Sequence, residues 1–486
     1  MHNERSTRRD FLAFIGTGAA IIVVAGCAGT KVATRPVPSG GVFVQPDELR
    51  SVNGRLAVTL TAEATMVPFG AKTRFAYTYN GSTPGPTLRV RPGDTVVVTL
   101  RNRLGTDTNL HTHGLHVSPS GDSDNIFVMV PPGGEHTYTY AIPADHPSGL
   151  FWYHPHAHGH VAEQIAGGLA GAIIVTDDLD DVAEIAGSTE RLLILADPRI
   201  GSSASVLATS QMDRMQGRQG DVVVINGIAQ PSLAVTAGTL ERWRILNSSA
   251  ARYYRLALDG HQLHVMASDG GRLTAPVTAS EILLAPGERT EVLVTPTQAG
   301  SYRLRALRYD RGSSGMGGGM GGRASGSTTE TVIATMNVTG SASAARLPSA
   351  LAKTSSVIPT ISATRTVTLA MGAGGGMGAG SMMAFTIDGK AFDPARTDIT
   401  ARVGTAEEWA IRNTSVMDHP FHLHVWPFRI VDGPPTAGWK DTVNVPAGHT
   451  VTIRIAFTDL PGRTVYHCHI LDHEDLGMMG TINVTP

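Results

Sequence analysis

The chain has 486 residues, and its 39 lysines and arginines nearly balance its 41 aspartates and glutamates. This balance excludes the one-sided basic field that nucleic-acid binding requires, so we expect no nucleic-acid partner. The two cysteines, Cys27 and Cys468, lie near opposite ends of the chain, which excludes a disulfide framework.

The N-terminal segment has the features of an export signal. Arg8 and Arg9 form a twin-arginine pattern, and an apolar stretch follows over residues 11–25. Small residues precede Cys27 and resemble a bacterial lipobox, so we expect residues 1–27 to be a signal and Cys27 to carry a lipid anchor. A plain cleaved signal and an uncleaved helix are the alternatives. The sequence thus predicts twin-arginine export to the cell envelope, with membrane contact only through this anchor, because no second apolar stretch is long enough to span a bilayer.

Beyond the signal, the sequence predicts an all-β fold of about three domains. Residues 28–41 are rich in Thr, Pro, Ser and Gly and predict a tether. Short runs of Val, Ile, Thr and Tyr then recur between turn residues, without a long amphipathic helical pattern. We expect β-sandwiches over residues 42–180, 181–345 and 355–486.

Ten of the 19 histidines gather in four short motifs, which is far from a random scatter. The motifs are His111-Thr112-His113, His154-Pro155-His156, His419-Pro420-Phe421-His422-Leu423-His424, and His467-Cys468-His469 with His473 and Met478 following. A single His-x-His is usually an ordinary structural pair, and His-Cys-His alone could belong to a zinc site. Four such motifs together predict several neighbouring metal sites.

Strand geometry explains the spacing within the motifs. Side chains alternate between the two faces of a strand, so the imidazoles of a His-x-His motif share one face, roughly 7 Å apart. The same rule turns Cys468 away from the face of its two neighbours. His419 lies three residues before His422 and five before His424, and these odd separations turn it away from their face. The pattern predicts two metal sites, placed back to back.

One of these sites has the donor set of a blue-copper electron-transfer centre. That centre uses a thiolate, two imidazoles and a weak thioether. The four donors are supplied by Cys468, His419, His473 and Met478.

The four motifs together resemble the copper motifs of the multicopper oxidase family, which includes laccases, ferroxidases and bacterial cuprous oxidases. The resemblance implies three cupredoxin-like Greek-key β-sandwiches and four copper ions: one type 1, one type 2 and two type 3. It implies type 2 ligation by His111 and His422. It implies one type 3 ion held by His113, His154 and His469, and the other held by His156, His424 and His467. Type 1 copper would be held by Cys468, His419 and His473, with Met478 axial.

Two positions depart from the family pattern. Val425 follows the third motif where many members have glycine, which affects a turn but no ligand. Thr112 stands where laccases often have tryptophan, and its side chain is expected to point away from copper.

Reduction of O2 to water consumes protons, so carboxylates are expected near the cluster. Asp122 or Asp124 resembles the family's acidic position after the first motif, and Glu474 follows His473. Asp441 matches another family phrase and is expected to orient a ligand histidine. For the first three positions, a solvated loop charge is the alternative.

Methionines suggest the electron donor. Met-rich, Gly-rich stretches over residues 312–326 and 371–383 predict flexible loops. They contain Met316, Met320, Met371, Met377, Met382 and Met383. Thioether sulfur prefers Cu(I), and such insertions resemble those of bacterial cuprous oxidases. Met417 and Asp418 precede His419 and are further candidates for contact with the donor. A low-complexity linker is the alternative for both loops.

The leading hypothesis is a monomeric enzyme that takes electrons from Cu(I), and also from Fe(II), Mn(II) or phenols, and passes them to O2. Its partners would be a metal-ion or small-molecule donor and O2. A copper-storage protein without turnover is the alternative from another class, although storage needs no cysteine between cluster histidines. A copper nitrite reductase is a third hypothesis, but it would not need all eight cluster histidines.

Overall fold

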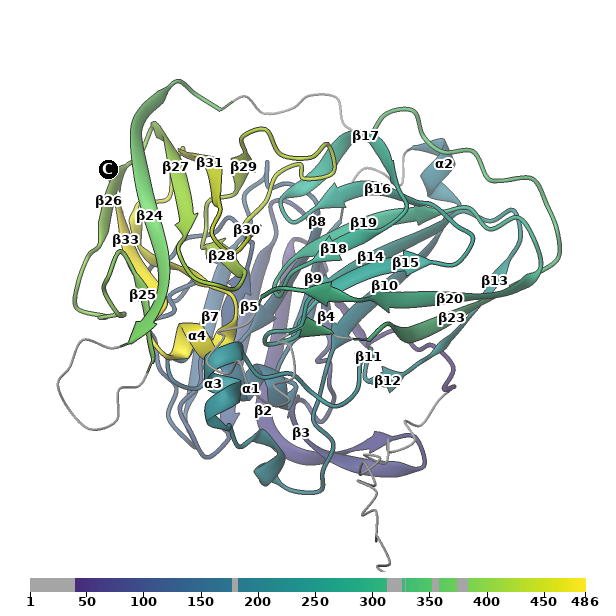
Figure 1. The fold of residues 1–486 in the computed structure, drawn as a ribbon, viewed down its shortest axis with the longest axis horizontal. Helices are drawn as coiled ribbons and strands as arrows, with labels where there is room; N and C mark the ends of the chain where they lie inside the picture. The colour runs from purple at the N-terminus through teal and green to yellow at the C-terminus, as the bar shows by residue number, and fades with distance from the viewer. Residues whose placement is uncertain (1–39, 177–181, 313–325, 328, 352–357, 374–382) are drawn as a thin grey trace, which may run out of the picture. The chain divides into compact units, whose positions relative to one another are not determined.

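The computed structural model describes residues 40–176, 182–312, 326–327, 329–351, 358–373 and 383–486. The predicted signal and Cys27 lie outside these ranges, as does most of the tether. Among the described residues, no helix is both long enough and apolar enough to cross a membrane. The fold class predicted from the sequence is confirmed: the chain is all-β and built from cupredoxin-like sandwiches (Figure 1).

The first sandwich consists of two sheets. One has the order β1 (Glu48–Arg50), β4 (Thr87–Val90), β9 (Gly171–Val175), β8 (Gly149–His154), β6 (His111–His113). The other has the order β3 (Lys72–Tyr79), β2 (Arg55–Phe69), β5 (Thr95–Arg103), β7 (Glu135–Ala141). In β5 every second residue is buried, as the period of a half-buried strand requires. Val98 and Leu100 of β5 pack with Phe151 of β8 in the core between the sheets.

The second sandwich has one large and one smaller sheet. The large sheet has the order β12 (Ile228–Ala229), β11 (Val224–Ile225), β10 (Thr189–Ala196), β14 (Glu241–Asn247), β19 (Arg289–Val294), β16 (Leu263–Ser268), β17 (Gly271–Ala279). The smaller has the order β13 (Ser232–Thr236), β23 (Thr331–Thr339), β20 (Gly300–Leu307), β15 (Tyr254–Leu258), β18 (Ile282–Leu284). A short pair, β21 (Tyr309–Asp310) with β22 (Gly326–Ser327), follows.

Strands β14 and β19 are buried along their whole length. One face of their sheet packs on the smaller sheet, with Trp243 and Val292 in that core. The other face meets the first sandwich, where Leu246 packs with Trp152 and Ile174. The second sandwich therefore has a broad buried contact with the first, and charged residues on that face of β14 and β19 must find partners there.

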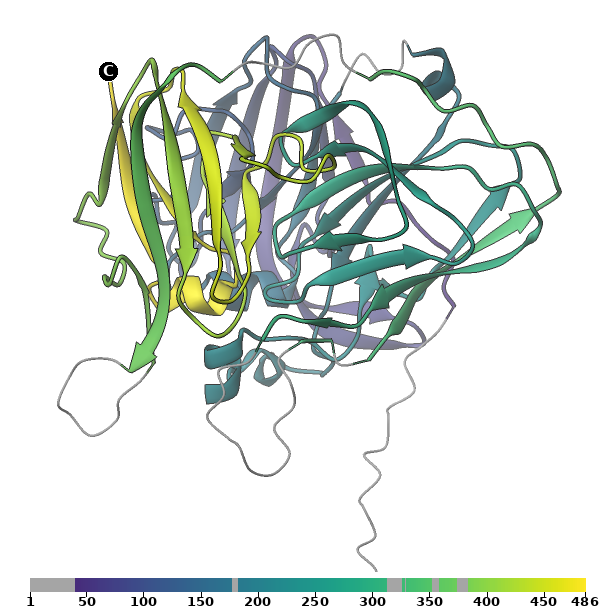
Figure 2. The same cartoon turned by 45° about the horizontal axis from the view of Figure 1, so that its top comes forward.

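The third sandwich holds the C-terminal motifs. One sheet has the order β25 (Met383–Ile387), β24 (Ile361–Ala373), β27 (Thr405–Asn413), β31 (Thr450–Phe457), β29 (Phe428–Ile430). The other has the order β26 (Ile399–Arg402), β33 (Met479–Thr485), β32 (Gly462–Cys468), β28 (His419–Leu423), β30 (Thr442–Val445). Figure 2 shows these strands, green to yellow, with the yellow helix α4 (Leu471–Asp475) at one end.

The helices are short, and α4 lies with two of them where the sandwiches meet. The others are α1 (Val161–Gly167), α2 (Ala183–Ala186), the 3₁₀ helix η2 (Ala204–Leu207) and α3 (Gln211–Gln216). Helix α4 contacts both α1 and α3 (Figure 1). Val161 of α1 and Leu471 of α4 share an apolar cluster with Ala250 of the second sandwich. All three sandwiches therefore meet beside the end of β32.

Candidate metal centre

A thiol and two imidazoles meet at the end of β32. The Sγ of Cys468 lies 3.3 Å from His419 Nδ1 and 3.9 Å from His473 Nδ1, and the two Nδ1 atoms are 3.3 Å apart. All three side chains are fully buried. Met478 is also buried, in the same apolar cluster as Cys468, and its carbonyl accepts a hydrogen bond from the Cys468 amide. These donors fit a type 1 copper ion.

The outer nitrogens of the two imidazoles are tied to neighbours. His419 Nε2 lies 2.8 Å from Ser415 Oγ, and His473 Nε2 lies 3.2 Å from the carbonyl oxygen of Met215 in α3. Such contacts fix the ring orientation and leave each Nδ1 facing the thiol. Burial lowers the pKa of His419 to about 3 and that of His473 well below its usual value, so both rings are neutral ligands at neutral pH.

Eight further histidines form a second cluster, shared between the first and third sandwiches. They are His111, His113, His154, His156, His422, His424, His467 and His469. Strand pairing brings them together in each sandwich, since His111 lies opposite His154, and His422 lies opposite His467. All are buried, with at most 1% of their surface exposed.

Among the described residues, five of these imidazoles have a buried ring nitrogen without a hydrogen-bond partner: His111, His156, His422, His424 and His469. Nε2 of His111 and Nε2 of His422 are buried without a hydrogen-bond partner in the described part of the chain. Their Nδ1 atoms are occupied, by Asp124 at 2.9 Å and by the carbonyl of Asp441 at 2.8 Å. Burying an unpaired polar nitrogen is costly, so these atoms fit a metal ion as their missing partner. They are the two histidines expected to hold type 2 copper.

The remaining six histidines form two groups of three. Nε2 of His467 lies 3.2 Å from Nε2 of both His156 and His424. In the other group, Nε2 of His154 lies 3.4 Å from Nδ1 of His113, and both rings lie within 5.9 Å of the His469 ring, centroid to centroid. These groups are the two triads that the resemblance implies for type 3 copper.

Burial favours the neutral form of several cluster imidazoles. It lowers the pKa of His111, His154, His424 and His469 well below the usual value, and neighbouring imidazoles add to the effect. Neutral imidazoles have a free lone pair for a metal ion. The donor set, imidazole nitrogen throughout with one separate thiol, suits copper.

Only one of the two candidate aspartates after the first motif lies at the cluster. Asp124 is buried and accepts hydrogen bonds from His111 and from the Thr112 amide. Burial raises its pKa to about 7. The Asp122 side chain is 72% exposed and lies 3.4 Å from His136 on the surface, so it does not reach the cluster.

Glu474 lies directly beside the cluster, in α4. One carboxylate oxygen is 3.0 Å from His467 Nδ1 and the other is 3.5 Å from His156 Nε2. Burial opposes its charge, but His467 and His156 together lower the pKa of Glu474 to about 2. It is therefore ionised beside the cluster.

The residues predicted to contact the electron donor do not form one group. Met417 is fully buried in the core of the third sandwich, and Asp418 is buried with hydrogen bonds from Tyr309 and Asn444. Met383 begins β25, and Met382 lies outside the described residues.

Part of the predicted loop over residues 371–383 is wrong. Met371 lies within β24 and packs against the core of the third sandwich, because β24 and β25 extend their pairing to Ala373 and Met383. Met316, Met320 and Met377 lie outside the described residues.

Val425 stands directly after His424, where many members of the family have glycine. It has a φ of 70°, in the left-handed region that glycine adopts readily and a β-branched residue does not. Its side chain is buried in the core of the third sandwich, and its carbonyl accepts a hydrogen bond from His116 of the first. The turn after His424 is thus kept at the expense of backbone strain.

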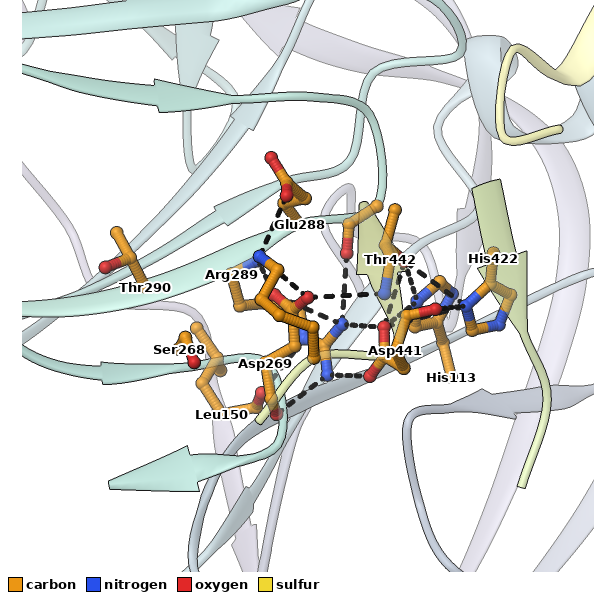
Figure 3. A network of polar contacts seen from close by, with 12 residues as sticks. His113, Leu150, Ser268, Asp269, Glu288, Arg289, Thr290, His422, Asp441 and Thr442 are labelled. Carbon is orange, nitrogen blue, oxygen red and sulfur yellow. Dashed lines mark hydrogen bonds and ion pairs between the residues drawn. The ribbon is translucent and has the colours of Figure 1, made fainter. Parts of the chain in front are cut away.

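Sequence reasoning missed the charged residues behind the cluster. Figure 3 shows Arg289 and Asp269 of the second sandwich beside Asp441, with Glu288 farther from it. Lys440 Nζ lies 2.9 Å from Asp269 and 2.8 Å from Glu288. No motif marks Asp269 or Arg289. Their only signal is that each charge adjoins a strand, β16 or β19, that proves to be largely buried.

Comparison with known proteins agrees with this site. Models of the family described as "Multicopper oxidase" match residues 61–180, 200–324 and 365–486. The multicopper oxidase mco of Staphylococcus aureus is 31% identical, over 90% of this chain and 91% of its own. A laccase of Bacillus subtilis is 28% identical, over 84% and 90%. A solved multicopper oxidase from Campylobacter jejuni, described as a metallo-oxidase, superposes with a TM-score of 0.81 at 28% identity, covering 93% and 96%. The chain is therefore an oxidase of the multicopper oxidase family.

Proposed function

We propose that this oxidase takes single electrons from Cu(I) beside Cys468 and reduces O2 to water at the eight-histidine cluster, with four copper ions bound. Copper supplies the one-electron redox chemistry at both places. The observation that carries the proposal is the position of Cys468 between His467 and His469, so that one strand end belongs to both sites. The peptide links from Cys468 to its neighbours provide a short covalent path for electrons.

Two carboxylates are placed to handle the protons that O2 reduction consumes. Asp124 has a pKa of about 7, so it can both hold and release a proton near neutral pH. Glu474 is ionised beside His467 and His156, where its negative charge favours the arrival of protons at the cluster. Neither side chain is exposed, so protons must reach them through the protein or through ordered water.

The surroundings of His473 favour a small donor over a bulky phenol. Both type 1 imidazoles are fully buried, and α3 covers His473 through the Met215 carbonyl. Helix α3 also carries the Met212 side chain, which is 55% exposed, while Met215 is half-buried. Two thioethers on the helix over His473 suit Cu(I). The description of the Campylobacter jejuni protein as a metallo-oxidase supports the same choice of donor.

A role in copper tolerance follows from this activity, because oxidising Cu(I) removes the more reactive ion. We propose that the protein works in the cell envelope after twin-arginine export, held by a lipid at Cys27, as a monomer. Mass spectrometry of the mature N-terminus tests the anchor: an acylated Cys27 supports it, and a chain that begins at another residue rejects it.

The test of the proposed function is O2 uptake by the copper-loaded protein with Cu(I), Fe(II), Mn(II) and a phenol. We expect the highest kcat/KM with Cu(I). Copper binding without O2 uptake would favour storage, and nitrite consumption would favour a nitrite reductase.

A double variant, Met212→Leu with Met215→Leu, tests the choice of donor. It should raise KM for Cu(I) and leave the blue absorption unchanged. The matched control is Met66→Leu, since Met66 is 42% exposed on β2 of the first sandwich. An unchanged KM in the double variant would remove α3 from the donor site.

A further inference from the structure

Arg289 links the second sandwich to a copper site to which that sandwich contributes none of the ligands identified above. It is the first residue of β19, only 1% exposed, and it lies beside Asp441 (Figure 3). Both Arg289 and Asp441 are buried, so their contact is shielded from solvent. A buried ion pair at a junction of three sandwiches is a costly arrangement unless every donor and acceptor is satisfied.

Every N–H of the Arg289 side chain has an acceptor. Nη1 and Nη2 donate to the two carboxylate oxygens of Asp441 at 2.7 and 2.6 Å. Nε donates to the carbonyl of Leu150, and the remaining two N–H groups donate to the carbonyls of Gly287 and Asp269. A guanidinium has five N–H donors in a fixed plane, and here all five are used. The acceptors come from all three sandwiches.

Asp441 in turn holds two cluster histidines from different sandwiches. Its carboxylate accepts a hydrogen bond from His113 Nε2 at 3.0 Å, and its carbonyl accepts one from His422 Nδ1 at 2.8 Å. The two imidazole rings stack, with centroids 3.8 Å apart and planes 13° apart. Asp441 therefore sets the ring orientation of one type 3 and one type 2 ligand at the same time.

Two glycines show how closely the second sandwich packs against this cluster. A Cβ on Gly114, directly after His113, would overlap both the Arg289 guanidinium and the Asp441 carboxylate. A Cβ on Gly287, whose carbonyl accepts from Arg289, would lie 2.9 Å from the ring of His469. Glycine at position 114 therefore leaves the space that the Arg289–Asp441 pair occupies, and a larger residue there would displace the pair.

We propose that Arg289 is a positioning residue through which the second sandwich fixes the trinuclear site: it holds Asp441, and Asp441 holds His113 and His422. The proposal rests on the proposed function only in taking the eight-histidine cluster as a copper site. Loss of the guanidinium leaves a buried carboxylate without its bidentate partner. The carboxylate is then free to rotate away from His113 Nε2, at 3.0 Å, and from His422 Nδ1, at 3.6 Å, while the Asp441 carbonyl still accepts a hydrogen bond from His422. The Cys468 site has separate contacts, to Ser415 and Met215, and should keep its copper.

The test compares Arg289→Gln, Arg289→Lys and a control, Arg244→Gln. Arg244 is also 1% exposed and lies in the neighbouring strand β14, where it forms ion pairs with Glu190 and Glu291. Each copper-loaded protein is dialysed against a graded chelator. Copper content, the type 2 electron paramagnetic resonance signal and the type 1 blue absorption are then measured, none of which depends on turnover.

We expect Arg289→Gln to lose cluster copper at roughly 10- to 100-fold lower chelator concentration than the wild type, with the blue absorption retained. Arg289→Lys should fall between the two, because an ammonium restores the charge but not the two parallel hydrogen bonds. Arg244→Gln should keep both copper signals. Should Arg289→Gln fail to fold, the Arg289→Lys comparison decides.

Two results would overturn the proposal. One is wild-type retention of cluster copper in Arg289→Gln, or in Arg289→Lys where that variant decides. The other is loss of both copper signals together in Arg289 and Arg244 variants alike, which would show a general effect on stability. A wild type that binds copper but does not consume O2 would reject the proposed function and leave this comparison unaffected.

Discussion

Cys468 lies directly opposite Phe421 in the antiparallel pairing of β32 with β28. The next pair along the ladder is His467 with His422, whose side chains face the other way. The thiol thus sits in the apolar core of the third sandwich while its two neighbours reach the cluster. Replacing the thiol should therefore affect one copper site and spare the other.

Cys468→Ser should remove the intense blue absorption and the type 1 copper ion. His467 and His469 keep their positions on the other face, so the type 2 electron paramagnetic resonance signal should remain. Absorption spectra and copper-to-protein ratios of the two proteins provide the measurement. Blue absorption in the variant would refute the assignment of Cys468.

Asp124→Asn should slow O2 uptake by roughly 100- to 10,000-fold, the usual contribution of a positioned proton donor or acceptor. The amide oxygen can still accept a hydrogen bond from His111, so copper content should stay at the wild-type value. Asp122→Asn is the matched control, because that side chain is exposed beside His136. Equal rates in the two variants would contradict a role for Asp124 in proton transfer.

Glu190→Gln tests a contact between the first two sandwiches. Glu190 accepts from Arg89 of the first and from Arg244 of the second. Burial opposes its charge, but the two arginines lower the pKa of Glu190 to about 2. A carboxylate whose pKa is lower in the folded than in the unfolded protein stabilises the fold at any pH above its unfolded-state pKa. This contribution is lost as the pH falls through the folded-state pKa. The wild type should therefore unfold at a higher temperature than the variant at neutral pH.

The same argument predicts how that difference depends on pH. The gap in unfolding temperature between wild type and Glu190→Gln should shrink as pH falls from about 4.5, the ordinary value, to about 2. Thermal unfolding followed by circular dichroism over this range measures it. A gap that is constant with pH would mean that the ion pair does not contribute through its charge.

Two substitutions of Val425 should separate backbone strain from packing. Val425→Gly loses a buried side chain worth about 1.5–3 kcal/mol but relieves strain of about 1–3 kcal/mol, so the two effects nearly cancel. Val425→Ala loses most of the packing and also keeps the positive φ, which costs a non-glycine residue about 1–2 kcal/mol. The alanine variant should therefore be the less stable of the two in thermal unfolding. The opposite order would show that φ at this position costs little.

The separation of Cys468 from the cluster histidines could be predicted from the sequence because it depends on local strand geometry. Strand alternation alone turns Cys468 away from His467 and His469, and it needs no knowledge of the rest of the fold. The same kind of reasoning could not choose between Asp122 and Asp124. The choice depends on a turn that brings the Asp124 carboxylate onto the Thr112 amide.

The contact of Arg289 with Asp441 could not be predicted, because it joins segments that are distant in the sequence. Arg289 and Asp441 are 152 residues apart and meet only when the second and third sandwiches pack together. Met371 was misjudged for a related reason. Its glycine-rich neighbours indicate a loop, but pairing of β24 with β25 continues through them and places Met371 against the core.

The stoichiometry of donor oxidised per O2 consumed tests the central claim most directly. With copper-loaded protein and Cu(I) as donor, an oxygen electrode measures the O2 consumed, a colorimetric Cu(I) assay measures the donor oxidised, and a peroxide assay detects incomplete reduction. The account predicts four Cu(I) oxidised for each O2, with no hydrogen peroxide released. Two Cu(I) per O2 with accumulating peroxide, or no O2 uptake by fully loaded protein, would contradict it.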